Sequence, residues 1–249
     1  MNKVSKVISI QKPGFWIKKS LGQNFLINKG VLEKILNAAE LKKEDIVVEI
    51  GPGTGDLTEK LLKKAGHIVA IEKDPRFINV LKEKFVNSNI EIIEGDVLNF
   101  SSSLSRSQAS GKYKVVGNIP YYITSRLLKK IFEEWPTPDL VVLMVQKEVA
   151  QRIVAKPPKM NLLALSVQFY SEPKIISYVS RGSFRPIPKV DSAIIRLRPT
   201  DYRLQLKNSG LSAVDPKHLF KLIKTAFAGK RKQLKNTIGS DILKNTGIK

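Results

Sequence analysis

The chain of 249 residues contains no cysteine and only two histidines, His67 and His218. Without cysteine there is no disulfide framework and no thiolate metal site, which is typical of proteins in a reducing compartment. Two histidines provide little material for a histidine-based metal centre or for a Ser/His/Asp triad. We therefore expect a protein that binds no metal and uses no histidine as a general base.

Long apolar runs are also missing. The longest, residues 140–145, is far shorter than the roughly 20 residues that a membrane-spanning helix needs. The lysine-containing N-terminus has no apolar segment of signal-peptide length. We expect a soluble, cytoplasmic monomer with no membrane contact, long enough for one main domain and a small additional one.

Acidic residues are scarce relative to basic ones. The chain has 43 Lys+Arg against 22 Asp+Glu, a net charge of +21 and a pI near 10.0. Solubility alone would be served by interspersed charges of both signs. An excess of this size favours a polyanionic partner, and nucleic acid is preferred because no lipid-anchoring feature is present. Composition does not separate RNA from DNA.

Strand-like and helix-like segments alternate regularly over the middle of the chain. Apolar runs typical of buried strands cover residues 46–50, 67–72, 90–93, 113–116 and 140–145. Amphipathic helical patterns lie between several of them. This alternation predicts an α/β fold in which helices cover both faces of a parallel sheet. In such a fold, ligands bind beyond the carboxyl ends of the strands.

Groups suited to a nucleoside cofactor follow the first three strands. The first strand runs into a loop that contains Gly51, Gly53 and Gly55, where glycine allows close approach of the backbone to a ligand. Glu72 ends the second strand, about 20 residues on, where an acidic residue binds ribose hydroxyls in nicotinamide and adenosine cofactors alike. Asp96 follows the third strand and can accept a hydrogen bond from an adenine amino group.

The segment after the fourth strand is suited to a planar base with an amino group. The side-chain oxygen of Asn118 can accept a hydrogen bond from an exocyclic NH₂. Pro120 stiffens the turn and leaves the Ile119 carbonyl free to accept the second amino hydrogen. Tyr121 offers a flat face for stacking. An amine held in this way suits methyl transfer from S-adenosylmethionine, because hydride transfer from a nicotinamide needs no such group.

Five ordered motifs and a C-terminal segment resemble the ribosomal RNA adenine N6,N6-dimethyltransferases, with the small-subunit (16S) enzymes as the nearest branch. The motifs are Lys-Ser-Leu-Gly-Gln-Asn-Phe-Leu at 19–26, Val-Glu-Ile-Gly-Pro-Gly-Thr-Gly at 48–55, Gly-Asn-Ile-Pro-Tyr-Tyr at 117–122, and the segments 144–153, 183–192 and 227–236. The resemblance implies a Rossmann-like methyltransferase fold with S-adenosylmethionine as cofactor. It further implies dimethylation of two adjacent adenosines near the 3′ end of 16S ribosomal RNA, and a role in small-subunit biogenesis.

The resemblance also implies roles for individual residues. Asn24 and Leu26 would contact the cofactor from the N-terminal segment, and the three glycines would frame its methionine end. Glu72 would bind the ribose hydroxyls, Asp96 the adenine amine, and Asn118 would lie between cofactor and target. Tyr121 and Phe184 would sandwich the target adenine. With Asn118, Pro120, Tyr121 and Phe184 as the catalytic group, no general base is required.

We divide the chain into a basic arm at 1–17, a methyltransferase domain at 18–200 and a small, basic helical domain at 201–249. The last is predicted to bind RNA through phosphate contacts that position it without reading its sequence. Its proposed RNA-binding residues are Lys230, Arg231, Lys232 and Lys235.

Three other functions remain open from the sequence. One is methylation of adenine in large-subunit (23S) RNA, as in the macrolide-resistance relatives. Another is a ribosome assembly factor in which catalysis is secondary or lost. The third is a nicotinamide oxidoreductase, for which we find neither a substrate domain nor a proton donor. Because one fold supports many functions, the choice depends on the site residues.

Overall fold

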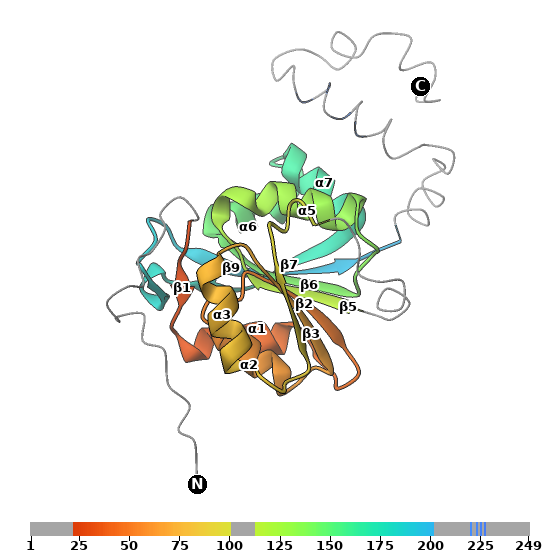
Figure 1. The fold of residues 1–249 in the computed structure, drawn as a ribbon. Helices are drawn as coiled ribbons and strands as arrows, with labels where there is room; N and C mark the ends of the chain where they lie inside the picture. The colour runs from red at the N-terminus through yellow and green to blue at the C-terminus, as the bar shows by residue number, and fades with distance from the viewer. Residues whose placement is uncertain are drawn as a thin grey trace.

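The computed structural model describes residues 22–100 and 113–201, together with Phe220, Ile223, Thr225 and Phe227 (Figure 1). The predicted basic arm and the proposed RNA-binding residues Lys230, Arg231, Lys232 and Lys235 lie outside the described residues. The predicted domain division therefore stays a prediction.

A seven-stranded sheet of order β4-β3-β2-β5-β6-β9-β7 forms the centre of the described part. Its parallel strands are β2 (Ile46–Ile50), β3 (His67–Glu72), β4 (Ile90–Glu94), β5 (Tyr113–Asn118) and β6 (Leu140–Gln146). β9 (Ser192–Pro199) runs antiparallel between β6 and β7 (Ser171–Val179). The five parallel strands match the sequence prediction to within two residues, whereas the antiparallel pair was not predicted.

Helices cover both faces of the sheet (Figure 1). One face carries α1 (Lys29–Ala38), α2 (Asp56–Leu62) and α3 (Pro75–Lys84), and the other carries α5 (Thr124–Glu133), α6 (Lys147–Ile153) and α7 (Leu162–Tyr170). Capping side chains explain where two of these helices begin. Asn28 accepts hydrogen bonds from the first turn of α1, and Asp74 caps α3, whose first residue is proline. The α/β architecture predicted from the alternating pattern is confirmed.

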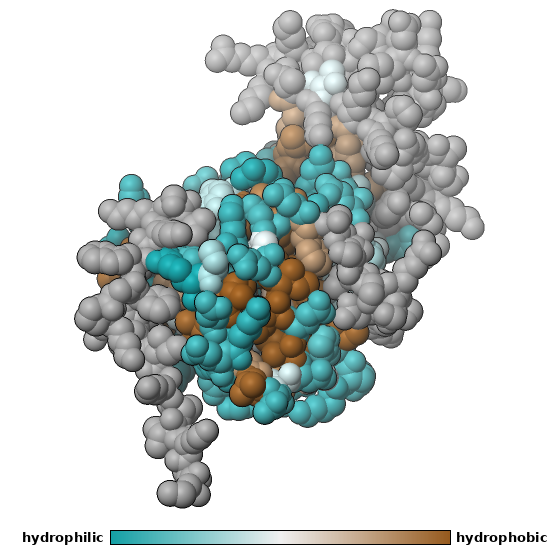
Figure 2. Space-filling view, viewed as in Figure 1, coloured by the Kyte–Doolittle hydropathy of each residue, from teal (hydrophilic) through white to brown (hydrophobic). Residues whose placement is uncertain are grey.

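The sheet separates two apolar cores because successive side chains of a strand point to opposite faces. Val48 of β2 packs in the core under α5, α6 and α7, whereas its neighbour Val47 packs in the core under α1 and α2. Both side chains are fully buried. Among the residues coloured in Figure 2, hydrophilic ones cover much of the visible surface, and an apolar area lies near its centre.

A second, two-stranded sheet lies beside the large one. β1 (Phe25–Leu26) pairs antiparallel with β8 (Phe184–Arg185), which links two segments far apart in the sequence. Short 3₁₀ helices η2 (Tyr121–Ile123) and η3 (Arg181–Ser183) precede α5 and β8. Within the part of the chain that the structure describes, no helix is long and apolar enough to cross a membrane.

Candidate active site

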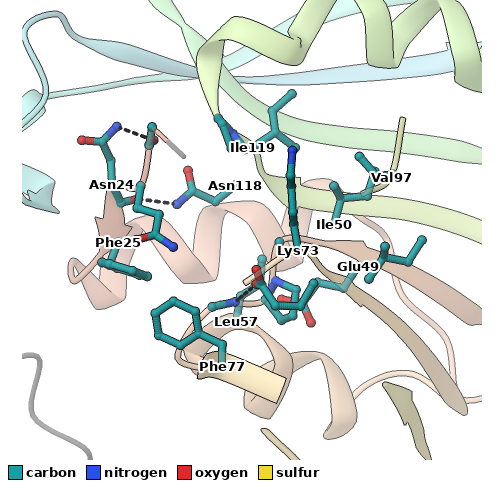
Figure 3. Close-up of a pocket in the computed structure, with 18 of the residues that line it drawn as sticks. Asn24, Phe25, Glu49, Ile50, Leu57, Lys73, Phe77, Val97, Asn118 and Ile119 are labelled. Carbon is teal, nitrogen blue, oxygen red and sulfur yellow. Dashed lines mark hydrogen bonds between the residues drawn. The ribbon is translucent and has the colours of Figure 1, made fainter. Parts of the chain in front are cut away.

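The carboxyl ends of β2, β3, β4 and β5 surround one cavity at the edge of the sheet (Figure 3). Segments from four parts of the chain that are distant in sequence meet there because parallel strands all end at one edge. The residues predicted to bind a cofactor or a base that do line this cavity are Asn24, Leu26, Gly51, Gly53, Glu72, Asp96, Asn118, Pro120 and Tyr121. Two predicted residues, Gly55 and Phe184, lie outside its lining.

The glycine loop follows β2 with left-handed backbone at its three glycines. Gly53 has φ +55°, and a Cβ there would lie 3.1 Å from Cε1 of Phe25. Gly55 has φ +78°, and a Cβ there would lie 2.7 Å from Cε2 of Phe85. Any other residue would therefore add backbone strain at both positions, a tight contact with Phe25 at position 53 and a clash with Phe85 at position 55. Gly55 is the N-cap of α2 and packs against Leu81 of α3 and against Phe85, the C-cap of α3. This packing, rather than the cavity, requires glycine at the position.

Glu72 fixes the position of the glycine loop. Its Oε2 accepts a hydrogen bond from the backbone N–H of Gly53 at 3.0 Å, and its Oε1 accepts one from Asp74 N–H at 2.8 Å. The side chain is buried, and burial raises the pKa of the Glu72 carboxyl, while the backbone donors act in the opposite direction. Both carboxylate oxygens keep lone pairs with which to accept further hydrogen bonds.

A second carboxyl group, Glu49, lies deeper in the cavity wall. The residue is 1% exposed, and its Oε2 has no hydrogen-bond partner among the described residues. Burial raises the pKa of Glu49 to about 8, and the nearby Glu72 carboxylate adds to this increase. A buried carboxyl with an unsatisfied oxygen beside a cavity is a common feature of binding sites.

Asp96 forms an ion pair with Lys73 in the lining of the cavity. Its Oδ2 accepts from Lys73 Nζ at 2.8 Å, and its Oδ1 accepts from the backbone N–H of Leu98 at 2.9 Å. Burial acts to raise the pKa of Asp96, but the hydrogen bonds from Lys73 and Leu98 outweigh it, so the pKa is lowered. Asp96 therefore lines the cavity as a carboxylate held by a neighbouring cation.

Asn118 is the last residue of β5 and has a defined orientation (Figure 3). Its Nδ2 donates a hydrogen bond to the backbone carbonyl of Asn24 at 2.9 Å. Since a carbonyl can only accept, this contact leaves the Oδ1 of Asn118, a residue of the cavity lining, as an acceptor. Among the described residues no donor is bonded to that oxygen.

Hydrogen bonds and strand pairing hold the N-terminal segment that orients Asn118. Asn24 Nδ2 donates to the Gly22 carbonyl at 3.1 Å, and Gln23 Nε2 donates to Asp74 Oδ2 at 2.8 Å. Leu26 lines the cavity and pairs with β8. This segment forms one wall of the cavity, as the prediction for Asn24 and Leu26 requires.

Tyr121 lines the cavity three residues after Asn118. Its hydroxyl is 2.7 Å from Ser192 Oγ at the start of β9, which fixes the position of the ring. Burial raises the pKa of the Tyr121 hydroxyl, while the hydrogen bond to Ser192 lowers it. Ser192 is completely buried, so this anchor is rigid. The predicted adjacency of Asn118, Pro120 and Tyr121 is present in the lining.

Phe184, which is predicted to stack against the target base, lies outside the cavity lining in this structure. Phe184 has no exposed surface and packs in the core under α1 and α2. The cause is the β1–β8 pairing, in which Phe184 lies opposite Leu26 and both side chains enter the same core. The ring therefore has no exposed face in this structure, and its stacking against a target base stays a prediction.

Sequence analysis also missed three residues of the site. Phe25 lies against the glycine loop and forms an edge-to-face contact with Phe77, with ring centroids 5.4 Å apart. Glu49 and Lys73 line the cavity, but each is a single ionisable residue within or after a strand pattern. The sequence did offer a signal for both: Glu49 lies two residues before Gly51, and Lys73 directly follows Glu72. No group of three or more His, Asp or Glu suited to a metal ion occurs among the described residues.

The arrangement is suited to a nucleoside-containing ligand next to a planar amine. Carboxyl groups from β2, β3 and the loop after β4 line the cavity together with the amide of Asn118 and the ring of Tyr121. Hydroxyl and ammonium groups are donors that carboxylates bind well. The amide oxygen and ring can bind an aminated base.

Comparisons with known proteins agree with this site. Residues 14–246 match the sequence model of the family described as "Ribosomal RNA adenine dimethylase". The protein named "Ribosomal RNA small subunit methyltransferase A" from Dehalococcoides mccartyi (strain CBDB1) is 46% identical over 226 residues, which cover 90% of this chain and 75% of that protein.

Two solved structures are similar over most of the chain. A dimethyladenosine transferase from Plasmodium falciparum has a TM-score of 0.74 and 34% identity, over 89% of this chain and 77% of the other. The 23S rRNA methyltransferase ErmE has a TM-score of 0.69 and 28% identity, over 86% of this chain and 83% of the other. With a family match over nearly its whole length and this site geometry, the chain belongs to the ribosomal RNA adenine dimethylase family of methyltransferases.

Proposed function

We propose that this protein transfers methyl groups from S-adenosylmethionine to the N6 amines of two adjacent adenosines near the 3′ end of small-subunit (16S) ribosomal RNA. The observation that carries the proposal is Asn118, a residue of the cavity lining whose Nδ2 donates to the Asn24 carbonyl and whose Oδ1 stays available as a hydrogen-bond acceptor. The small-subunit substrate is supported by the 46% identical relative of that name, against 28% identity to the 23S enzyme.

The cavity fits S-adenosylmethionine by the chemistry of its polar groups. Glu72 retains lone pairs for the ribose hydroxyls, and Asp96 is a carboxylate suited to the adenine amine. The buried Glu49 carboxyl has an unpartnered Oε2 and, in its ionised form, is suited to the ammonium group of the methionine end. When bound, this cofactor supplies an electrophilic methyl group on a sulfonium.

Asn118 and the Ile119 carbonyl have the task of activating a poor nucleophile. The N6 lone pair of adenine is delocalised into the ring, so it must be turned towards the methyl group. Accepting both amino hydrogens favours a pyramidal N6 and stabilises the positive charge that develops on it. The new C–N bond replaces the S–C bond, and the excess N6 proton leaves to solvent, so no general base is needed.

Tyr121 has the task of holding the base after it leaves the RNA stack. A target adenine must be unpaired or flipped out, and stacking on an aromatic ring restores about 1–3 kcal/mol of the lost contact. The hydrogen bond to buried Ser192 keeps the ring in place for this contact. The same pocket must accept a monomethylated amine for the second transfer.

The net charge of +21 supports an RNA partner, and a cytoplasmic location next to ribosomal particles follows from the proposed substrate. The basic residues Lys230, Arg231, Lys232 and Lys235 stay assigned to phosphate contacts in a small C-terminal domain.

Transfer of a labelled methyl group to purified small and large subunits that lack the modification tests the proposal, with digestion of the RNA to nucleosides. We expect dimethyladenosine from small subunits only, and a loss of this signal in Asn118→Ala. Label in large-subunit RNA alone would overturn the substrate assignment. Bound cofactor with no label in either subunit would overturn methyl transfer itself.

A further inference from the structure

A second cavity opens at the same edge of the sheet, outside the cofactor cavity. It has a volume of about 360 Å³ and lies between the start of α6 and the loop that leads into β9. We call it the α6 groove; it is lined by residues 146–148, Gln151, Arg181 and residues 189–191. The proposed function uses none of these residues.

The α6 groove begins next to the residue that anchors Tyr121. Ser192, whose Oγ is 2.7 Å from the Tyr121 hydroxyl, lies opposite Gln146 in the β6–β9 ladder. The following residue, Lys147, donates its backbone N–H to the carbonyl of Asp191 at 3.0 Å. A polynucleotide with one base at Tyr121 therefore has this groove within reach of its neighbouring nucleotide.

The cations of the α6 groove are available to a ligand. Lys147, Arg181 and Lys189 form no ion pair with any carboxylate in the described ranges, although Glu148 and Asp191 also line the groove. The Asp191 Oδ1 accepts from the backbone N–H of Arg181 at 3.1 Å, so its charge is partly satisfied by the main chain. Glu148 is exposed to solvent. Unpaired cations on a strongly basic protein suit a phosphate group.

Aromatic and apolar surface lies beside these cations. Tyr178 is 52% exposed, and the Lys147 Nζ lies 5.2 Å from the centroid of its ring. Val190, which lines the groove, is 43% exposed. A cationic groove next to an exposed aromatic ring is the combination by which proteins bind single-stranded nucleic acid. The amides of Gln146 and Gln151 add hydrogen-bond donors and acceptors for a base edge.

We infer that the α6 groove binds the nucleotide directly next to the target adenosine, with its phosphate between Lys147, Arg181 and Lys189 and its base near Tyr178. The inference rests on the proposed function for its RNA substrate and adds a site that the methyl-transfer residues do not include. With two adjacent adenosines as targets, the groove holds one while the other is methylated.

The absence of cysteine makes a direct test possible, because Lys189→Cys in the full chain carries a unique thiol. An iron–EDTA group attached to that thiol generates hydroxyl radicals that cleave RNA close to it. The matched control is Lys64→Cys, an exposed lysine near the start of β3 at the opposite edge of the sheet. The probe is the small ribosomal subunit without the modification, and wild-type methylation of the same subunits identifies the target adenosines.

We expect the Lys189→Cys conjugate to cleave within a few nucleotides of the target adenosines, and the Lys64→Cys conjugate to leave them intact. Cleavage only elsewhere, or equal cleavage from both conjugates, would overturn the inference. If wild type methylates neither subunit, the proposed function fails. If wild type methylates and the Lys189→Cys conjugate does not cleave beside the targets, only the α6 groove assignment fails.

A binding measurement provides a second, independent test with Arg181→Ala/Lys189→Ala. We expect its affinity for the small subunit to fall roughly tenfold. The slope of log affinity against log salt should lose about 0.7 for each phosphate contact removed. Cofactor affinity without RNA should equal that of wild type, which excludes misfolding. An affinity and a salt slope equal to those of Lys64→Ala would overturn the inference.

Discussion

Polar and charged groups at the two ends of the central sheet differ in whether they have bonding partners. At the amino ends of the strands, buried Lys114 pairs with Asp45 at 2.8 Å and also donates to the Glu40 carbonyl. The Glu40 side chain binds Arg196 and Arg198, and the hydrogen bond from Arg198 is the main cause that lowers the pKa of Glu40. Each of these buried or bridging charges therefore has a partner.

At the carboxyl ends, polar groups are left partly unsatisfied. Glu49 keeps an oxygen without a partner among the described residues, and the Asn118 Oδ1 is not bonded to any described donor. This difference distinguishes polar groups that stabilise the fold from polar groups that can bind a ligand. Paired charges stabilise the fold, whereas unsatisfied groups at a cavity are available to a ligand. Substitutions at the amino ends should therefore change stability, and substitutions at the carboxyl ends should change activity.

The largest effect is expected from breaking the ion pair at the amino ends. Lys114→Met leaves Asp45 as a buried charge without its partner, which should lower the free energy of unfolding by about 3–5 kcal/mol. Chemical denaturation measures this change. Turnover of the protein that remains folded should stay close to that of wild type.

The double variant Lys114→Met/Asp45→Asn serves as the control for this experiment. It removes both charges, so it should recover much of the lost stability. A double variant as unstable as Lys114→Met would show that packing of the lysine stem, rather than the buried charge, is responsible.

Asn118→Ala should produce the opposite pattern at the carboxyl ends. Removing a fixed acceptor for developing charge should lower kcat about 100- to 1000-fold. The dissociation constant of the cofactor and the thermal midpoint should change little, because the Asn118 side chain bonds only the Asn24 carbonyl among described groups. Equal losses in turnover and in cofactor affinity would contradict the proposed role.

Most positions of the site could be predicted because they depend on local patterns. Apolar runs locate the strands, and the parallel order brings Gly53, Glu72 and Asn118 to one edge. The burial of Phe184 could not be predicted, since it depends on β8 pairing with a segment near the N-terminus. The raised pKa of Glu49 depends on its depth in the folded protein, which no sequence pattern encodes.

Glu49 should make the stability of the protein depend on pH. Burial raises its pKa from 4.5 to about 8, so the folded state keeps a proton that the unfolded state has lost. The contribution is complete below pH 4.5 and is lost as the pH rises towards 8. Within that window the slope is about 1.4 kcal/mol per pH unit.

Glu49→Gln should remove this slope while keeping the size of the side chain. Denaturation at several pH values between 5 and 8 measures it, and exposed Glu59→Gln, which lies in the neighbouring α2, is the matched control. A slope that is unchanged in Glu49→Gln would mean that another group, such as Glu72, causes the pH dependence.

The smallest effect on stability is expected at the Lys73–Asp96 pair, which is paired like the charges at the amino ends but lies at the carboxyl ends. This pair lies in the cavity, but Lys73 is half exposed, so Lys73→Met should change the free energy of unfolding by less than about 1 kcal/mol. The hydrogen bond from Lys73 lowers the pKa of Asp96, and its loss should raise that pKa. Carboxyl carbon NMR titration measures the shift directly, and Lys82→Met in α3 is the control. An unchanged pKa of Asp96 would mean that the hydrogen bond from the Leu98 N–H alone stabilises the carboxylate. The Lys73–Asp96 pair would then be a surface contact rather than part of the site.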